Sequence, residues 1–343
     1  MQAAAGAGEV HTGTPSVLVL PGTSPDLRVR LAAGLDAVNA LIEERVAHDD
    51  PFLAEAGAHL TQAGGKRFRP LLTLLAAEVG AGGNEQVVAA AAAVELTHLA
   101  SLYHDDVMDE ADVRRGAPSA NARYGNSTAI LVGDLLFGNA SDLVADLGPE
   151  AVRIQARTFM RLCAGQIRDD RPAPPGADPV EHYLGVLADK TGVLIATAAR
   201  YGGMFGGCDE ATVETLREYG ERLGMAFQLA DDLIDIGSDA DQTGKTPGAD
   251  LREGKRTLPV LHVLASTDPD DARLQALLAS DLSDDDDLAE ALAALRAHPA
   301  MERARQETYA VARRAGEALA PLPPSEAVDA LRALATGVVD RVG

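Results

Sequence analysis

The sequence contains a short acidic cluster whose residue spacing suits cation binding. In "DDVMD", Asp105 and Asp109 are four residues apart, so on a helix they share one face, with Cβ atoms roughly 5–6 Å apart. The preceding residues, "VELTHLASLYH", are largely apolar, which predicts a buried rather than a solvated helix. At an effective dielectric constant near 20, two carboxylates about 5 Å apart repel by about 3 kcal/mol. A folded chain keeps such a pair only if a cation offsets the charge, and oxygen ligands without His or Cys favour magnesium beside substrate phosphate.

The pattern occurs a second time. "FQLADDLID" places Asp231, Asp232 and Asp235 at the same spacing, again inside an apolar helical run. Gln228 lies three and four residues before the first two acids and shares their face. Two such clusters on different helices could face each other across a cavity and hold several metal ions.

Basic residues are distributed unevenly. The chain has thirty lysines and arginines. Only four are lysines, and each stands beside glycine or in another helix-breaking or polar context: Lys66, Lys190, Lys245 and Lys255. Arginines that could join them are Arg67, Arg69, Arg114 and Arg115. Lysine binds phosphate as a compact point charge, so this set is sufficient for two polyanionic groups. Acid pairs, magnesium and these cations together predict diphosphate chemistry.

Several other classes of protein are disfavoured. No GxxxxGK[ST] sequence occurs, which argues against nucleotide hydrolysis, and convincing strands are absent, which argues against a kinase. The net charge of −22 argues against nucleic-acid binding. The two cysteines, Cys163 and Cys208, form no metal-ligand spacing and are interpreted as core thiols of a reducing compartment. We expect no signal peptide and no transmembrane segment, because "SVLVLPG" lacks a basic flank and no run of about eighteen apolar residues occurs.

The elements that position these side chains are predicted to be helices. Alanine runs, the absence of tryptophan and an aromatic content of 3% favour an all-α fold. Residues 1–24 are expected to be a flexible tail and residues 25–343 a single large helical domain. Helices are predicted at 27–47, 68–80, 85–109, 127–146, 149–170, 179–204 and 210–237, followed by four or five shorter ones. The run "SDDDD" is predicted only to begin a helix.

The ordered motifs closely resemble those of the trans-polyprenyl diphosphate synthases, in the long-chain form typical of actinobacteria. From about Gly64 to Leu258 the sequence contains, in the family's order, "GGKRFRP", "DDVMD", "RRG", "GDLL", "DKTG", "FQLADDLID" and "GKTPGADLREGKRTLP". The resemblance implies a helical bundle of the isoprenoid synthase type around a deep central cavity, usually dimeric. It also implies elongation of an allylic prenyl diphosphate by isopentenyl diphosphate.

The resemblance further implies a role for each motif residue. Magnesium, three ions per active site, would be bound by Asp105, Asp109, Asp231 and Asp235, supported by Asp106 and Asp232. The allylic diphosphate would contact Arg114, Lys190, Lys245 and Lys255. Isopentenyl diphosphate would be held by Lys66, Arg69, His98 and Arg115. Thr191 and Gln228 would face the allylic cation, and the catalytic set would be Lys190, Thr191 and Gln228.

Product length is expected to depend on the helix that carries the first acidic cluster. Counting back from Asp105, its face offers Ser101 and Ala100, then Thr97 and Val94. In this family bulky aromatics four or five residues before the first aspartate give short products, whereas both residues here are small. The resemblance therefore implies a product longer than twenty carbons, typical of a quinone side chain. It implies a cytoplasmic enzyme that contacts a membrane peripherally to release its product.

Three alternatives remain open at this point. A class I terpene cyclase shares the fold and the first motif, but it normally lacks the second DDxxD and the basic set for isopentenyl diphosphate. A non-catalytic prenyl-diphosphate-binding subunit would bind ligand without turnover. The chain could also be the catalytic half of a hetero-oligomer that needs a small partner.

Overall fold

The protein was analysed as a computed structural model that describes residues 23–237 and 247–340. The first half of the described chain contains α1 (Pro25–Val46), α2 (Pro51–Gln62), α3 (Phe68–Ala77), α4 (Glu85–Met108), β1 (Val113–Arg114), β2 (Ala117–Pro118), α5 (Ala120–Tyr124), α6 (Asn126–Asp146) and α7 (Pro149–Asp169). The second half contains α8 (Pro179–Leu187), a π-helical turn (Ala188–Gly192), α9 (Val193–Phe205), α10 (Glu210–Gly237), α12 (Ala249–Arg252), α13 (Leu258–Leu264), a 3₁₀ turn (Pro269–Asp271), α14 (Ala272–Leu278), α15 (Asp285–Ala297), α16 (Pro299–Ala318) and α17 (Glu326–Val339).

The predicted all-α fold is confirmed, with some differences. The long helices of the first two-thirds lie where the apolar periodicity predicted them. The predictions missed α2, α5 and a two-residue ribbon in which Val113 pairs with Pro118 and Arg114 with Ala117. They also described the C-terminal helices as short, whereas α16 has 20 residues. The expected tail lies, except for its last two residues, outside the described residues.

Local sequence signals explain where many helices begin. α1 starts after Ser24, whose hydroxyl accepts a hydrogen bond from the backbone N–H of Leu27, and proline occupies its first position. α4 starts after Asn84, which caps it in the same way. The "SDDDD" run begins α15 as predicted: the Asp284 carboxylate accepts hydrogen bonds from two backbone N–H groups of the first turn.

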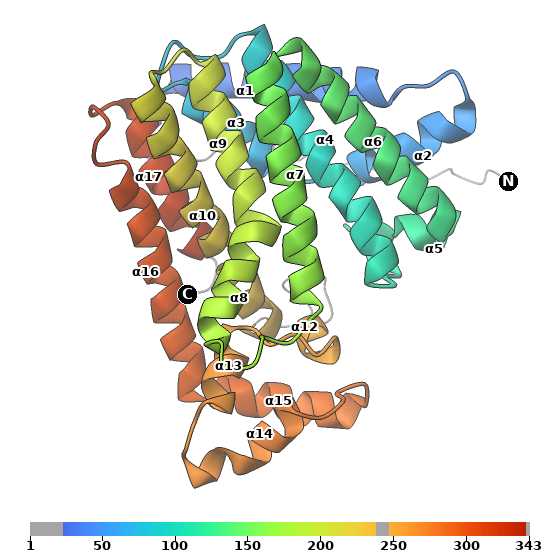
Figure 1. Cartoon of the computed structure of the whole chain (residues 1–343), viewed down its shortest axis with the longest axis vertical. Coiled ribbons are helices and arrows are strands. Elements are labelled where there is room, and N and C mark those ends of the chain that lie inside the picture. The colour runs from blue at the N-terminus through green and yellow to red at the C-terminus, as the bar shows by residue number, and fades with distance from the viewer. Residues whose placement is uncertain (1–22, 238–246, 341–343) are drawn as a thin grey trace, which may run out of the picture.

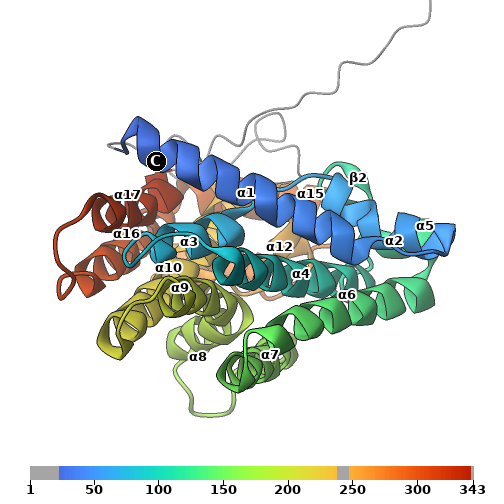
Figure 2. The same ribbon diagram turned by 90° about the horizontal axis from the view of Figure 1, so that it is seen from above.

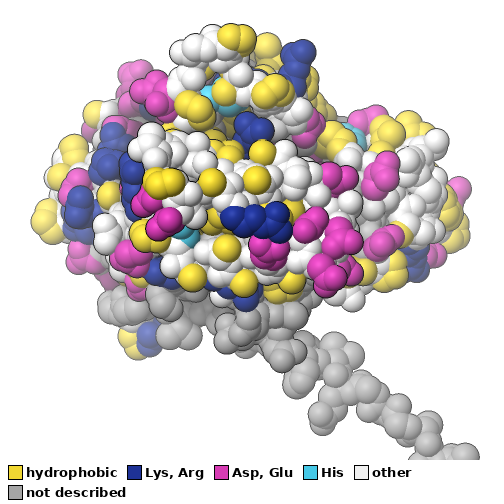
Figure 3. All heavy atoms as spheres, turned by 90° about the horizontal axis from the view of Figure 1, so that it is seen from below, with side chains coloured by type: hydrophobic (Ala, Val, Ile, Leu, Met, Phe, Trp, Pro, Cys, Tyr) yellow, Lys and Arg dark blue, Asp and Glu magenta, His cyan; other side chains and the backbone are white. Residues whose placement is uncertain are grey.

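The long helices run side by side around α4 and α10. In Figure 1 the helices α4, α6, α7, α9, α10 and α16 extend along the long axis, whereas α14 and α15 form the lower end of the molecule. Figure 2 shows α1 lying across the bundle beside α3 and α4. Buried apolar side chains from α1 to α17 form one continuous core, which supports the expected single domain. On the lower face, acidic side chains gather at several places with lysine and arginine between them (Figure 3).

Two helices, α4 and α6, are long and apolar enough to meet the length and hydropathy criteria of a membrane span. Two-thirds of the apolar window of α4 is buried, and α4 ends in the first acidic cluster, so it is a core helix of the bundle. α6 packs along α4, and 39% of its apolar window is buried. Polar residues interrupt both helices, so neither is a run of about eighteen apolar residues, and both are weak candidates for a membrane span because core helices of soluble proteins meet the same criteria.

Candidate active site

A cavity of about 1270 Å³ opens among α3, α4, α6, α7, the π-helical turn and α10. Its lining includes twelve of the predicted site residues: Lys66, Arg69, His98, Ser101, Asp105, Arg114, Arg115, Lys190, Thr191, Gln228, Asp231 and Asp235. Its other walls are largely apolar and include Leu102, Phe159, Leu162 and Phe227. One cavity therefore combines acids, bases and room for a hydrocarbon chain.

The first acidic cluster lies at the C-terminal end of α4. The backbone N–H of Asp109 bonds the carbonyl of Asp105 at 2.8 Å, so both acids still follow helical geometry. Asp106 points away from the cavity into the protein and is fully buried. Its carboxylate accepts hydrogen bonds from Nε of Arg114 at 2.6 Å and from the backbone N–H of Ala120 at 2.7 Å. Asp106 therefore holds Arg114 and the start of α5, and its support of the metal-binding acids stays a prediction.

Asp105 lies in an unfavourable environment for a carboxylate. Burial raises its pKa to about 6, and the charge of Asp109 adds to this, whereas Lys190 acts in the opposite direction. Arg114, at 3.6 Å from Asp109, also counteracts the raised pKa of Asp105. A cation bound at this end of α4 would relieve the remaining penalty.

The second acidic cluster lies on α10 and is larger than the sequence predicted. Asp232 is buried and accepts hydrogen bonds from the hydroxyl of Tyr183 and from Nε2 of Gln228, the latter at 2.8 Å. Asp250 joins the cluster from the short helix α12, and its backbone N–H bonds Oδ2 of Asp235 at 3.2 Å. Burial, followed by the charges of Asp232 and Asp235, raises the pKa of Asp250 to about 7. Burial also raises the pKa of Asp232 to about 6.

The "DKTG" residues form a π-helical turn in which the N–H of Val193 bonds the carbonyl of Ala188. Lys190 reaches from this turn to Asp169 at the end of α7, with Nζ 2.6 Å from Oδ2. The hydroxyl of Thr191 donates to Oε1 of Gln228 at 3.0 Å. The predicted catalytic set Lys190, Thr191 and Gln228 is therefore brought together on one wall of the cavity.

The basic residues of the "GGKR" and "RRG" loops meet at the opposite side. Arg115 has a left-handed backbone (φ 54°) and donates to the carbonyls of Leu60 and Gly64. Arg69 is half-buried, and its buried Nε has no hydrogen-bond partner among the described residues. Burial and the neighbouring charges of Arg69 and Arg115 lower the pKa of His98 well below its usual value, so its imidazole is neutral. A neutral imidazole and unsatisfied guanidinium donors suit an anionic ligand such as isopentenyl diphosphate.

Arg67 has a structural role as well. It also adopts a left-handed backbone (φ 47°), and its Nη1 lies 3.0 Å from Oε1 of Glu95. Glu95 is 2% exposed, so this is a buried rather than a surface ion pair. Two further hydrogen bonds, to Asn39 and to the carbonyl of Thr61, fix the guanidinium.

Some predicted residues do not line the cavity. These are Asp106, Asp109, Asp232, Lys255, Ala100, Thr97 and Val94, whereas Lys245 lies outside the described residues. Lys255 pairs with Glu253 at 2.5 Å and lies 3.9 Å from Asp250, close to the second acidic cluster. Ala100, Thr97 and Val94 are fully buried, and only Ser101 of the predicted length-determining set reaches the cavity surface.

Sequence reasoning missed residues that come from other elements. Three such residues contact or approach a motif residue: Asp169, Tyr183 and Asp250. None of them follows the four-residue spacing of the two acidic clusters. Asp250 lies in "TPGAD", within the last of the family motifs. An acid that follows a glycine turn in a motif was the feature of the sequence that could have identified it. Cys163, predicted as a core thiol, is instead exposed and lines the cavity.

The acids suit magnesium held jointly with a ligand. Within residues 23–237 and 247–340, no three His, Cys, Asp or Glu side chains alone form a metal cluster. The acids on the cavity come from α4, α10 and, with Asp134, from α6, and they offer only oxygen donors. Because magnesium takes one or two carboxylates together with phosphate oxygens, a bound diphosphate would complete the coordination.

Comparisons with known proteins agree with this geometry. The sequence model of the polyprenyl synthetase family matches residues 50–295. The nonaprenyl diphosphate synthase of Mycobacterium tuberculosis is 50% identical over 312 residues, which cover 91% of this chain and 93% of that protein.

Two solved structures are similar over nearly the whole chain. A decaprenyl diphosphate synthase from Rhodobacter capsulatus superposes with a TM-score of 0.84 at 38% identity, covering 93% of this chain and 99% of its own. A geranylgeranyl pyrophosphate synthase from Corynebacterium glutamicum, complexed with calcium and isoprenyl diphosphate, gives a TM-score of 0.83 at 44% identity, covering 93% and 98%. The activity of the chain is prenyl transfer that builds long-chain polyprenyl diphosphates. By these matches and by its site, the chain belongs to the polyprenyl synthetase family.

Proposed function

We propose that this prenyltransferase joins isopentenyl diphosphate to an allylic prenyl diphosphate in the cavity between α4 and α10, with the motif residues in the roles inferred from the sequence. The observation that carries the proposal is that acids from both helices and cations from three loops line one cavity with apolar walls. The allylic carbon–oxygen bond breaks, a carbon–carbon bond forms to isopentenyl diphosphate, and the released diphosphate accepts the proton. No side chain acts as a nucleophile.

The allylic diphosphate is placed between the two acidic clusters. Magnesium, three ions in our proposal, would be bound by Asp105, Asp109, Asp231 and Asp235, and it supplies charge that stabilises the departing diphosphate. Lys190 and Arg114 both line the cavity, and both lie close enough to Asp105 to lower its pKa. In the proposal, both contact that diphosphate directly. The predicted contacts from Lys245 and Lys255 belong to the same proposal.

The reacting carbons lie beside the π-helical turn. The oxygens of Thr191 and Gln228 face the allylic cation, and the hydrogen bond between them holds both in place. Lys66, Arg69, His98 and Arg115 hold isopentenyl diphosphate on the other side. His98 is neutral there and donates or accepts a hydrogen bond without adding charge.

The growing chain extends along the apolar walls. Ser101 lines the cavity four residues before Asp105. The apolar wall also includes Phe159 of α7, whose ring stacks on Phe137 at a centroid distance of 3.9 Å. A small residue at position 101 leaves this path open, which supports a product longer than twenty carbons. Beyond Ser101, the passage toward Ala100, Thr97 and Val94 requires displacement of packed side chains, because all three are fully buried.

We also propose that the chain forms a homodimer through α6 and α7. Large exposed apolar side chains on these two helices are Ile130, Leu131, Leu135, Val152, Met160 and Ile167. Such a concentration on neighbouring helices is typical of an interface. Light scattering should give twice the chain mass, and Leu131→Asp should give monomers. A monomeric wild-type protein would contradict this assignment.

A quinone side-chain precursor as product, a cytoplasmic location and peripheral membrane contact during release are further parts of the proposal. They are supported by the length of the product that the open cavity allows. Flotation with vesicles in the presence of product, compared with its absence, tests the membrane contact.

The test of the function is incubation of the purified protein with magnesium, labelled isopentenyl diphosphate and farnesyl diphosphate. Dephosphorylated products are sized by chromatography beside an Asp105→Ala control. Products beyond twenty carbons, absent in the control, are expected. Incorporation that stops at twenty would refute the open path at Ser101, and no incorporation would favour a binding subunit or a cyclase.

A further inference from the structure

The π-helical turn that carries Lys190 is held between two helices at backbone distance. A Cβ atom added to Gly165 of α7 would lie 2.5 Å from the backbone nitrogen of Lys190. A Cβ atom added to Gly224 of α10 would lie 2.7 Å from Cα of Gly192. Because only glycine permits these approaches, α7 and α10 both define where the turn lies.

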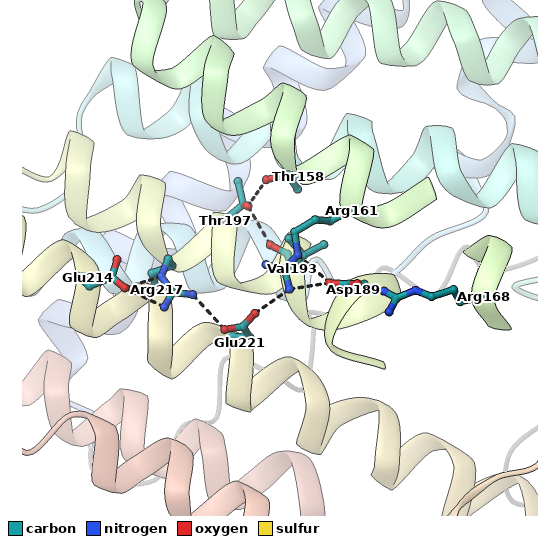
Figure 4. Close-up of polar contacts among 9 residues, drawn as sticks. All are labelled: Thr158, Arg161, Arg168, Asp189, Val193, Thr197, Glu214, Arg217 and Glu221. Atoms are coloured by element: carbon teal, nitrogen blue, oxygen red, sulfur yellow. Dashed lines mark hydrogen bonds and ion pairs between the residues drawn. The ribbon is translucent and has the colours of Figure 1, made fainter. Parts of the chain in front are cut away.

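The outer side of the turn is fixed by charge. Nε of Arg161, on α7, donates to Oδ1 of Asp189 at 2.7 Å, and its Nη2 donates to Oε1 of Glu221 on α10 at 3.0 Å. Arg168, about two helical turns further along α7, also pairs with Asp189. Figure 4 shows the Arg161 guanidinium between the two acids, so that one side chain joins α7, the turn and α10.

Two further contacts support this arrangement. Arg217 holds the second oxygen of Glu221 at 3.0 Å. Burial alone would raise the pKa of Glu221. Hydrogen bonds from Arg161 and Arg217 outweigh this and lower the pKa, so Glu221 remains ionised. Thr158 of α7 bonds Thr197 of α9 at 2.6 Å (Figure 4), which ties α7 to the helix that follows the turn.

We propose that Arg161, Asp189 and Glu221 are positioning residues that fix the π-helical turn so that Lys190 faces the substrate. The inference rests on the role proposed for Lys190 in binding the allylic diphosphate. Asp189 and Lys190 are adjacent, so the contact that restrains the first also restrains the backbone of the second. A π-helical turn is uncommon and is stabilised by contacts outside itself, which Arg161 supplies.

The exposure of the network indicates a geometric rather than a stabilising role. The side chains of Arg161, Asp189 and Glu221 are 42%, 19% and 25% exposed. Ion pairs that reach solvent to this extent add little to global stability. Displacement of a catalytic group by about 1 Å, in contrast, reduces turnover by about 10²-fold. Variants of the network should therefore fold but lose activity.

The experiment compares Arg161→Met and Asp189→Asn with Arg153→Met. Arg153 is a matched control, because it lies on α7 like Arg161 and pairs with Glu150 on the same helix, outside the network. We expect kcat/KM for the allylic diphosphate to fall at least tenfold in the first two variants and less than twofold in the control. The KM for isopentenyl diphosphate should change less than twofold in all three, and Arg161→Lys should recover part of the loss.

A second measurement separates positioning from general damage. When Lys190 is already replaced by alanine, Arg161→Met should have little further effect, because Arg161 acts through Lys190. We expect kcat/KM to change by less than twofold. The Kd of an unreactive allylic thiolodiphosphate, measured with magnesium, should also change by less than twofold. An equal fall on both backgrounds, or equal falls for Arg161→Met and Arg153→Met, would overturn the positioning role alone. A Lys190→Ala enzyme with wild-type kinetics would instead overturn the role assigned to Lys190, and the proposed positioning with it.

Discussion

Replacement of Asp105 by asparagine should stabilise the metal-free protein and at the same time abolish catalysis. Burial of the carboxylate, followed by the charge of Asp109, raises the pKa of Asp105 from 3.8 to about 6. This difference corresponds to a penalty of about 3 kcal/mol on the ionised form in the folded state. Asparagine keeps the shape and removes the charge.

The pH dependence follows from the direction of the shift. Because the folded protein binds the Asp105 proton more tightly than the unfolded chain, this group lowers stability as pH rises from about 4 to 7. The difference in unfolding free energy between Asp105→Asn and wild type should therefore be near zero at pH 4 and up to about 3 kcal/mol at pH 8.

The assay is urea unfolding without divalent metal at pH 4, 6 and 8. Asp109→Asn is the control, since Asp109 is more exposed and lies beside Arg114. Magnesium with inorganic diphosphate should then raise the midpoint of wild type but not of Asp105→Asn. A variant that is equally or less stable than wild type at pH 8 would refute the electrostatic reasoning, whatever its activity.

Three further results are expected. Tyr183→Phe removes the hydrogen bond to Asp232 and should raise the magnesium concentration needed for half-maximal activity about 10–100-fold, measured by metal titration. An unchanged titration would contradict the supporting role of Asp232. Glu95→Ala leaves Arg67 buried without its partner and should cost about 3–5 kcal/mol in urea unfolding, and a cost below about 1 kcal/mol would contradict the buried ion pair. Ser101→Phe should shorten the products without lowering incorporation of the first isopentenyl unit, and unchanged lengths on chromatography would show that the chain takes another path.

The spacing of the motif residues predicted which side chains meet, because helical periodicity fixes their relative directions. Asp105 and Ser101, four residues apart on α4, both reach the cavity as expected. Periodicity was less informative about Ala100. α4 is apolar on nearly every side, so its sequence does not reveal which flank faces the cavity and which packs into the core.

The contributions from other elements could not be predicted. Tyr183 reaches Asp232 from α8, and Asp169 reaches Lys190 from the end of α7. Each pairing depends on how two helices pack, and neither is expressed in the local pattern of one segment. The ribbon at 113–118 was missed for a related reason: two residues on each side are too short for alternation to be recognised.

Two cations of the site, Arg114 and Lys190, are already paired with acids in the structure. Arg114 contacts Asp106 and Asp109, and Lys190 contacts Asp169. An arriving diphosphate must therefore take over these cations by ion exchange, and carboxylates released in the exchange become available to divalent metal. Metal and diphosphate would each create part of the binding site of the other, so that by reciprocal linkage each should raise the affinity for its counterpart by the same factor.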